Sequence, residues 1–233
     1  MNINIYPSIT TTKLFKKFGN WRNFFKEVEE LKLTEVALFP TVLNPIERQE
    51  FWDYLKKSTI SSVPFVHLRD DFSREEVQFL IQNYGTQRFT IHLNAVKNYI
   101  DWPERKMFFV EQLFRPEESL AELEKYLPEF GGLTVDFSHL ERGKYNNHPD
   151  YQRSLELFNH HQLGIGHLNG FIRTFKMDTH YVYCKNNLNY LKNIPNYAWP
   201  DCIGLEMENP IRVQLKLKDY IIKLTHDKFA PKN

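Results

Sequence analysis

Short runs of apolar, β-branched and aromatic residues alternate along the chain with longer amphipathic segments. Runs of this length predict buried strands, and the amphipathic segments between them predict helices. The eight predicted strands cover Asn2–Tyr6, Glu35–Phe39, Val63–His67, Phe89–His92, Met107–Glu111, Leu133–Asp136, Gly164–His167 and Ile203–Glu206. The main predicted helices cover Trp21–Leu31, Pro45–Lys57, Ser73–Asn83, Pro116–Tyr126, Tyr151–His160 and Val213–Lys223.

Residues at the ends of the predicted helices support these boundaries. Pro45 and Pro116 suit a first helical turn, and Ser73 suits an N-cap position. Glycines stand where helices are expected to end, at Gly85, Gly131 and Gly132. The local signals therefore agree with the alternation of strands and helices.

The ends of successive predicted strands are about 19 to 39 residues apart, which is the length of a strand–helix crossover unit. Eight strands that alternate with helices predict a parallel sheet, and eight is the number that closes a barrel. The short connection from Asn94 to Arg105 leaves room for two helical turns at most, and a doubly wound open sheet is the alternative. No linker divides the sequence. We therefore predict an α/β fold with a single (β/α)8 TIM barrel over residues 1–233.

Composition narrows the class of protein. The chain has 233 residues, 42% of them hydrophobic, with 30 Lys and Arg against 29 Asp and Glu. This balance excludes a disordered chain and argues against a generally basic nucleic-acid binder, although a local basic face stays open. No apolar stretch reaches the length of a membrane span, and no signal peptide is apparent, so a cytoplasmic location is expected. The two cysteines exclude a disulfide framework and a four-thiolate zinc site.

Metal-competent residues stand at or just after the ends of six consecutive predicted strands. These residues are His67, His92, Glu111, Asp136, His139, His167, Asp178, His180 and Glu206. In a parallel barrel the carboxyl ends of all strands meet at one mouth, where the catalytic groups of this fold lie. A lone histidine in such a place is more often a core residue, and a lone carboxylate is more often a helix cap. Recurrence at six strands favours a common site.

Such a site requires cations. Four carboxylates in one cleft would repel each other, and burial would raise their pKa values. Divalent ions offset both effects, and imidazole with carboxylate suits zinc, manganese or iron. Arginines in the expected mouth loops would suit a phosphate-bearing substrate, with simple solvation as the alternative; they are Arg69, Arg115, Arg142 and Arg173.

Several short motifs of the sequence resemble those of the endonuclease IV branch of the xylose-isomerase-like barrel superfamily. The motifs that carry the resemblance are TEVALF at 34–39, the segment from Pro64 to His67, IHLN, the VE of the fifth strand, VDFSH, HLN, DTH and LEMENP. Each motif alone is weak, but their order and spacing together are specific. The resemblance extends from the second to the eighth predicted strand.

The resemblance implies three metal ions, usually zinc, with two or three expected here. One ion would take His67, His92 and Glu111. A second would share Glu111 and take Asp136, His167 and Glu206. A third would take His139, Asp178 and His180. Sugar isomerases of the same superfamily need only the second set, so the other ligands favour a phosphodiesterase.

The loops depart from the family pattern. The loop after the second strand reads PTVLNP, without the arginine that enters DNA in that family, and Arg69, Asp70, Asp71 and Phe72 replace a tyrosine after the third strand. The sequence therefore predicts a metal-dependent phosphodiesterase with damaged or abasic DNA as one candidate substrate. A sugar or sugar-phosphate isomerase, epimerase or dehydratase is the alternative. The catalytic candidates are Glu111, Glu206 and His180. The oligomeric state is left open.

Overall fold

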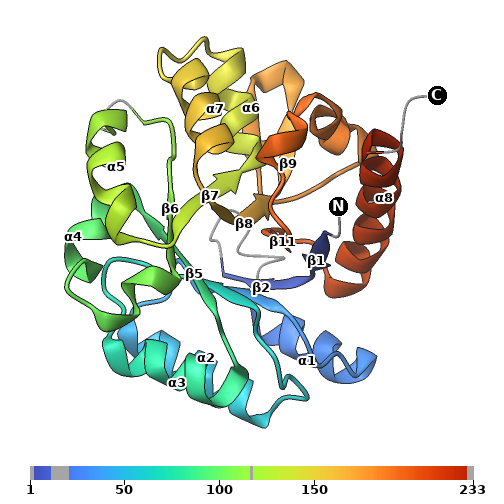
Figure 1. The fold of residues 1–233 in the computed structure, drawn as a ribbon. Helices are drawn as coiled ribbons and strands as arrows, with labels where there is room; N and C mark the ends of the chain where they lie inside the picture. The colour runs from blue at the N-terminus through green and yellow to red at the C-terminus, as the bar shows by residue number, and fades with distance from the viewer. Residues whose placement is uncertain (1–2, 12–20, 116–117, 230–233) are drawn as a thin grey trace.

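A computed structural model describes residues 3–11, 21–115 and 118–229 of the chain. Nine parallel strands form one sheet in the order β1-β11-β8-β7-β6-β5-β4-β3-β2. Its two ends are β1 (Asn4–Tyr6) and β2 (Ser8–Thr10), which only Pro7 separates in the chain. β1 pairs with β11 and β2 with β3, so the sheet returns on itself as a nearly closed barrel (Figure 1). The fold is a (β/α)8 TIM barrel, as predicted, and the open-sheet alternative is wrong.

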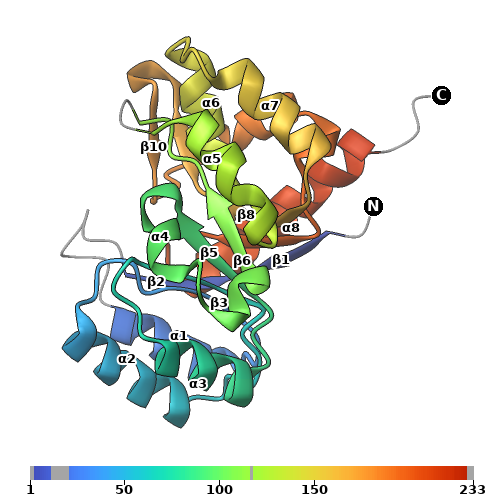
Figure 2. The ribbon, with the colours of Figure 1, turned by 60° about the vertical axis from the view of Figure 1, so that its left-hand side comes forward.

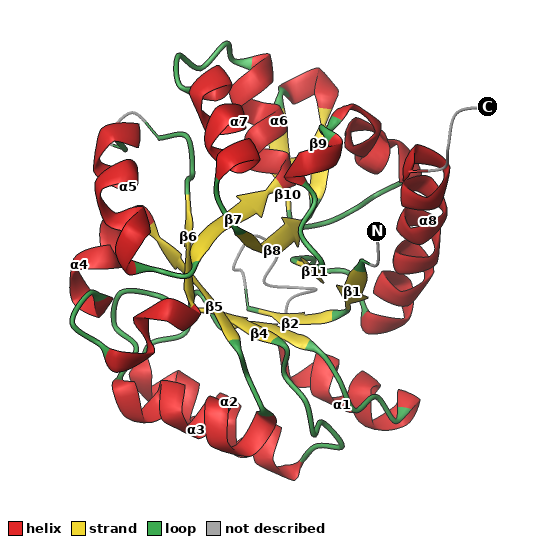
Figure 3. Ribbon diagram, viewed as in Figure 1, coloured by secondary structure: helices red, strands yellow, loops and turns green. Residues whose placement is uncertain are grey.

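The remaining barrel strands overlap the predicted ones. They are β3 (Ala37–Phe39), β4 (Phe65–His67), β5 (Arg88–His92), β6 (Phe108–Glu111), β7 (Gly132–Asp136), β8 (Leu163–Leu168) and β11 (Cys202–Leu205). Helices surround this ring on its outer side (Figure 3). They are α1 (Trp21–Leu31), α2 (Pro45–Lys57), α3 (Arg74–Tyr84), α4 (Val96–Tyr99), α5 (Leu120–Tyr126), α6 (Phe137–Tyr145), α7 (Tyr151–His160) and α8 (Ile211–Phe229).

Capping residues fix several of these helices. α2 begins with Pro45 in its first turn, behind an Asn44 capping box, and α3 begins with a Ser73 capping box. Gly85 ends α3 with a φ of 64°, in the left-handed region that glycine adopts without a steric penalty. Gly131 and Gly132 follow a 3₁₀ turn, η3 (Leu127–Glu129), that extends α5. The expectation for Pro116 lies outside the described residues.

The connection from β5 to β6 is short, as predicted. Between the 3₁₀ turns η1 (Leu93–Ala95) and η2 (Pro103–Met107) it holds only the four-residue helix α4. The long connection from β8 to β11 was not predicted in detail. It contains an antiparallel hairpin of β9 (Gly170–Ile172) and β10 (Met177–Thr179), whose turn is η4 (Arg173–Phe175). The 3₁₀ segments η5 (Lys185–Asn193) and η6 (Asn196–Ala198) follow the hairpin. Figure 2 shows β10 of the hairpin in a second view.

Aromatic rings fill the barrel interior. Phe39, Phe65 and Phe109 are buried in an inner cluster that is distinct from the layer between strands and helices. Gly164 leaves room for the Phe109 ring, since a Cβ there would lie 2.0 Å from a ring carbon. The Phe65 ring stacks on His167, with centroids 5.9 Å apart. The aromatic rings therefore form a packed apolar layer inside the barrel. The polar groups at the strand ends contact this layer.

Candidate metal centre

The barrel brings the predicted ligands to one mouth, at the carboxyl ends of the strands. His67, His92, Glu111 and Asp136 are the last residues of β4, β5, β6 and β7. Adjacent strands place His92 directly opposite Glu111, and Asp136 directly opposite His167 of β8. Glu206 follows β11. These six residues, His67, His92, Glu111, Asp136, His167 and Glu206, are called the inner group below.

Glu111 lies at the centre of the inner group. Its Oε2 is 3.5 Å from His67 Nε2 and 3.6 Å from His92 Nε2. It is also 3.5 Å from His167 Nδ1. Glu111 Oε2 is buried and has no hydrogen-bond partner among the described residues. An acceptor oxygen surrounded by three imidazole nitrogens at these distances is typical of ligands around a cation.

The two histidines beside Glu111 point their ring nitrogens at the same place. His67 Nε2 and His92 Nε2 are 3.0 Å apart, and His67 is fully buried. Burial lowers the pKa of His67 well below its ordinary value, despite the opposing charge of Glu111. Burial likewise lowers the pKa of His92 to about 4. Both imidazoles are therefore neutral near pH 7, the form in which histidine binds a metal.

His167 is oriented by a residue that the sequence analysis did not identify. Its Nε2 lies 3.0 Å from the Thr90 hydroxyl, so the other nitrogen, Nδ1, faces the carboxylates. Nδ1 has no hydrogen-bond partner among the described residues and lies 3.7 Å from Glu206 Oε2. Thr90 precedes His92 by two positions and therefore lies on the same side of β5. This two-residue periodicity of a strand could have identified Thr90 from the sequence.

Asp136 is also held by unpredicted neighbours. The Ser138 hydroxyl and the His139 backbone N–H donate to Asp136 Oδ1 at 2.8 and 2.7 Å, so Asp136 also caps α6. Asn169 Nδ2 donates to the other oxygen, Oδ2, at 3.4 Å. Asn169 is the last residue of the HLN motif, and Ser138 lies in VDFSH, so both lie in motifs noted above. Such contacts fix the direction of a ligand carboxylate.

The carboxylates show why a cation suits the inner group. Burial raises the pKa of Glu206 well above its ordinary value, and the nearby charges of Asp136, Glu111 and Asp178 raise it further. Burial would also raise the pKa of Glu111, but His167, His67 and His92 outweigh it and lower that pKa. Glu111 is thus ionised, while Glu206 resists charging. A divalent ion between them would remove this penalty.

Ligand atoms of seven predicted residues form three compact groups, in each of which all atoms lie within 4.8 Å of one another. The groups are His67, His92 and Glu111; His67, His167 and Glu206; and Glu111, Asp136 and His139. The first reproduces one expected set of ligands. The second and third combine residues that the sequence analysis had assigned to different ions. These groups fit metal ions, because imidazole nitrogens and carboxylate oxygens face one another, and Glu111 Oε2 and His167 Nδ1 have no hydrogen-bond partner among the described residues.

The remaining ligands sit at the outer edge of the mouth. His139 lies on α6, Asp178 on β10 and His180 just after it; these three are called the rim group. His180 Nδ1 is 3.2 Å from the backbone oxygen of Glu206 and 3.8 Å from Glu206 Oε1. No compact group found among the described residues includes Asp178 or His180.

Asp178 instead has a cationic partner within the protein. Arg142 Nη1 donates to Asp178 Oδ1 at 2.8 Å, and Arg142 Nη2 donates to the Leu113 backbone oxygen at 2.8 Å. Burial would raise the pKa of Asp178, but His139 and Arg142 outweigh it and lower the pKa. Arg142, which the sequence analysis had assigned to phosphate, is thus engaged by a carboxylate here.

The other three predicted arginines lie in different places. Arg69 and Arg115 line a small polar pocket of about 70 Å³ together with His92 and Asn94. Arg69 Nη1 donates to the Thr41 backbone oxygen at 2.9 Å, which holds it beside the mouth. Arg173 is exposed in the turn of the β9–β10 hairpin. Arg69 and Arg115 therefore adjoin the ligand candidate His92, as Arg142 adjoins Asp178.

No family model matches the chain, and no curated protein matches it either. No helix among the described residues is both long and apolar enough to span a membrane. The xylose-isomerase-like branch and the cytoplasmic location therefore stay predictions from the sequence.

Proposed function

We propose that this protein is a metal-dependent hydrolase that cleaves phosphodiesters with two divalent ions, of which zinc is the first candidate. The observation that carries the proposal is Glu111 Oε2, which three imidazole nitrogens surround at 3.5 to 3.6 Å. Two neighbouring ions that share one carboxylate are typical of phosphoesterases. The order of motifs supports a place in the endonuclease IV-like branch of the xylose-isomerase-like barrels.

The ligands divide into two sides around Glu111. His67 and His92 would hold one ion, and His167, Glu206 and Asp136 would hold the other. When bound, such ions supply Lewis acidity to phosphoryl oxygens and lower the pKa of a water molecule. Thr90 keeps the Nδ1 atom of His167 free for this role, and Ser138 and Asn169 aim Asp136. The protein thereby fixes the positions of charge before substrate arrives.

Arg69 and Arg115 would bind the non-bridging phosphate oxygens. Both line the small pocket beside His92, so a phosphate there would adjoin the ligands of the first ion. Guanidinium groups bind phosphate oxygens in a bidentate manner and keep their charge at all relevant pH values. Damaged or abasic DNA is one candidate substrate, although the PTVLNP loop after β3 lacks an arginine for entering DNA.

An isomerase or epimerase acting on a small polyol or ketose is the second candidate. It is favoured by two carboxylates, Glu111 and Glu206, that approach His167 Nδ1 from different strands at 3.5 and 3.7 Å. A carboxylate pair of this kind can move a proton between adjacent carbons. The engagement of Asp178 by Arg142 also favours it, because this chemistry does not need the rim group.

The test compares substrates and one variant. Protein purified without added metal is analysed for its metal content and then assayed on a chromogenic phosphodiester, abasic duplex DNA, intact duplex DNA and a ketose. We expect hydrolysis of the chromogenic diester that a chelator abolishes, and a large loss of turnover in His92→Ala. Metal-dependent epimerisation that survives His92→Ala, without hydrolysis, would replace this proposal by the isomerase. Fewer than one bound metal per chain would contradict both.

A further inference from the structure

A lysine-lined pocket lies outside the barrel, between η5 and α8. Its volume is about 820 Å³, and its lining includes five lysines, Lys185, Lys192, Lys216, Lys223 and Lys228. Asp219 is the one carboxylate among its lining residues. Because the whole chain has a net charge of only +1, the pocket concentrates positive charge that the rest of the molecule lacks.

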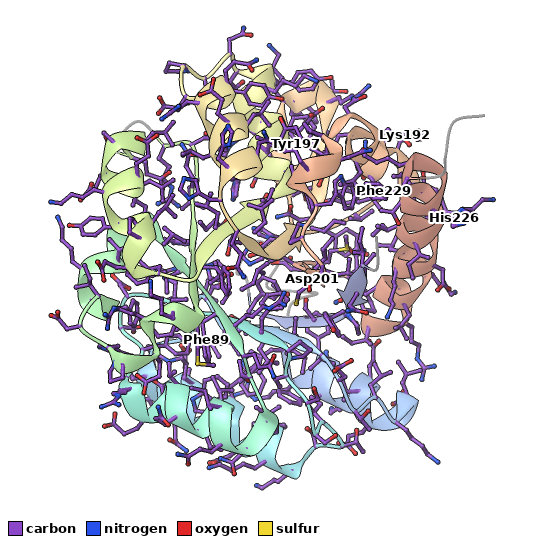
Figure 4. All side chains as sticks on the ribbon, viewed as in Figure 1. Phe89, Lys192, Tyr197, Asp201, His226 and Phe229 are labelled. Carbon is purple, nitrogen blue, oxygen red and sulfur yellow. The ribbon has the colours of Figure 1, made fainter. Side chains whose placement is uncertain are left out.

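Contacts between η5 and α8 hold the two walls of this pocket together. Tyr220 of α8 contacts Asn189 of η5 through its hydroxyl at 3.3 Å, and Lys228 Nζ donates to the Lys192 backbone oxygen at 3.0 Å. Lys185 Nζ lies 5.1 Å from the centre of the Tyr220 ring. Figure 4 places Lys192 beside the end of α8, near Phe229. The pocket therefore lies where η5 and α8 pack together through specific side-chain contacts.

The lysines differ from the other cations of this region. Arg212, near the start of α8, pairs with Glu30 at 2.7 Å. No ion pair with a carboxylate is recorded within the described residues for Lys185, Lys192, Lys216 or Lys223, and all four are exposed. The charges of these exposed lysines on the two walls add together, and no ion pair within the described residues neutralises the four. Their charge is available to an anion from outside.

We propose that this pocket binds the phosphate backbone of single-stranded nucleic acid. Lys216 and Lys223 are seven residues apart on α8, a rise of about 10 Å, and a rise of about 14 Å separates Lys185 and Lys192 on η5. Two rows of this length match a short stretch of a polyanion better than one small anion. A lysine ammonium group binds backbone phosphates without contacting the base edges, so it does not select a sequence. The ring of Tyr220 could stack on a base.

The size of the pocket favours a single strand over a duplex. Pockets of about 300 to 1,000 Å³ enclose ligands of drug size, and this one has about 820 Å³. A few nucleotides of one strand fit this range, whereas a duplex would contact the pocket only at its edge. The inference deepens the proposed function and rests on it in one respect: a strand bound here would belong to a substrate of the metal centre.

Binding is measured in EDTA, so that the metal centre plays no part. A fluorescein-labelled 12-nucleotide single strand is titrated with protein and followed by anisotropy. We expect a Kd in the range of about 10⁻⁴ to 10⁻⁶ M, with a log–log salt slope of about −3. Lys216→Gln with Lys223→Gln should weaken binding at least fivefold and reduce the size of the slope by about 1.4. Asp219→Asn should strengthen binding, which no unfolding artefact can imitate.

The matched control is Lys57→Gln with Lys125→Gln. It removes the same charge from exposed lysines on α2 and α5, two helices that do not line the pocket. Equal binding by the two double variants would overturn the proposal, as would equal displacement by polyglutamate or preference for a duplex. Hydrolysis of a chromogenic diester distinguishes the two ideas, because it tests the metal centre alone and should be equal in wild type and the Lys216/Lys223 variant.

Discussion

The inner group and the rim group of the candidate metal centre are held in different ways. Inner ligands such as Glu111 and His167 come from the carboxyl ends of strands, are buried, and have ligand atoms with no hydrogen-bond partner among the described residues. Of the rim group, Asp178 comes from a short hairpin and is already paired with Arg142. The barrel thus fixes one half of the centre, while the other half depends on side-chain pairing.

This difference indicates where metal should bind first. A buried carboxylate among neutral imidazoles has a high cost without a cation, so the inner group gains most from an ion. Asp178 gains less, because a guanidinium at 2.8 Å already compensates its charge. We therefore expect two tightly bound ions around Glu111, and the predictions below test this contrast.

Removing the shared carboxylate should have the largest effect. Glu111→Gln keeps the side-chain shape but removes the charge that two ions would share, so the metal content should fall from about two ions per chain to below one. Turnover on a chromogenic diester should fall at least about 10³-fold. Elemental analysis and kinetics check both. The matched control, Glu124→Gln, changes a half-buried glutamate paired with Arg153 and should leave both values unchanged. Retained metal in Glu111→Gln would remove Glu111 from the centre of the site.

The buried histidines should make the metal-free protein acid-sensitive. Burial lowers the pKa of His92 to about 4, so the folded state binds fewer protons than the unfolded state below the ordinary histidine value. Stability is therefore lost as pH falls from about 6.5 toward 4, by on the order of 3 kcal/mol for this residue. Urea unfolding in EDTA should show this slope, and His92→Gln should flatten it. An unchanged slope in His92→Gln would mean that the imidazole is not buried as described.

The orienting hydroxyl of Thr90 should have a smaller effect. Thr90→Val keeps the volume but removes the hydroxyl beside His167 Nε2, so metal affinity should fall about 10- to 100-fold. Competition with a chromogenic chelator measures this. Thr134→Val is the control, because Thr134 contacts Thr90 at 3.1 Å but is one step further from His167. A loss in Thr134→Val as large as in Thr90→Val would indicate general damage to the barrel interior.

Sequence patterns could predict the inner group because each ligand lies at or beside the carboxyl end of a largely buried strand. The strand predictions were confirmed within a few residues, and parallel strands necessarily bring their carboxyl ends together. The predicted first strand ended at Tyr6, before Pro7, and matches β1, so the sequence analysis missed β2. α8 extends to Phe229, beyond the predicted end at Lys223, because Leu224 continues its buried face.

The rim group could not be predicted in the same way. Its hairpin strands have three residues each, which is too short for a periodic pattern to be distinguished from a loop. The pairing of Arg142 with Asp178 joins residues 36 positions apart on α6 and β10. Such a contact depends on how the hairpin packs against α6, and no local signal in the sequence specifies it.

Releasing Asp178 from its arginine should change the metal count by one ion, which is the smallest effect and the most direct test of the contrast. Arg142→Met removes the guanidinium and leaves the carboxylate of Asp178 beside His139 and His180, the two other members of the rim group. Native mass spectrometry after zinc dialysis should then give about three ions per chain instead of about two, because the carboxylate gains a cation to replace the lost one.

Two further variants make this result decisive. Arg173→Met removes an exposed arginine from the hairpin turn and should leave the count at about two. Arg142→Lys keeps a positive charge but loses the fork that contacts both Asp178 and the Leu113 backbone oxygen, so its count should lie between those of wild type and Arg142→Met. A wild-type protein that already holds three ions would show that Arg142 yields Asp178 when metal arrives. In that case the rim group would be as ready for metal as the inner group, and the difference between them would lie only in the order of binding.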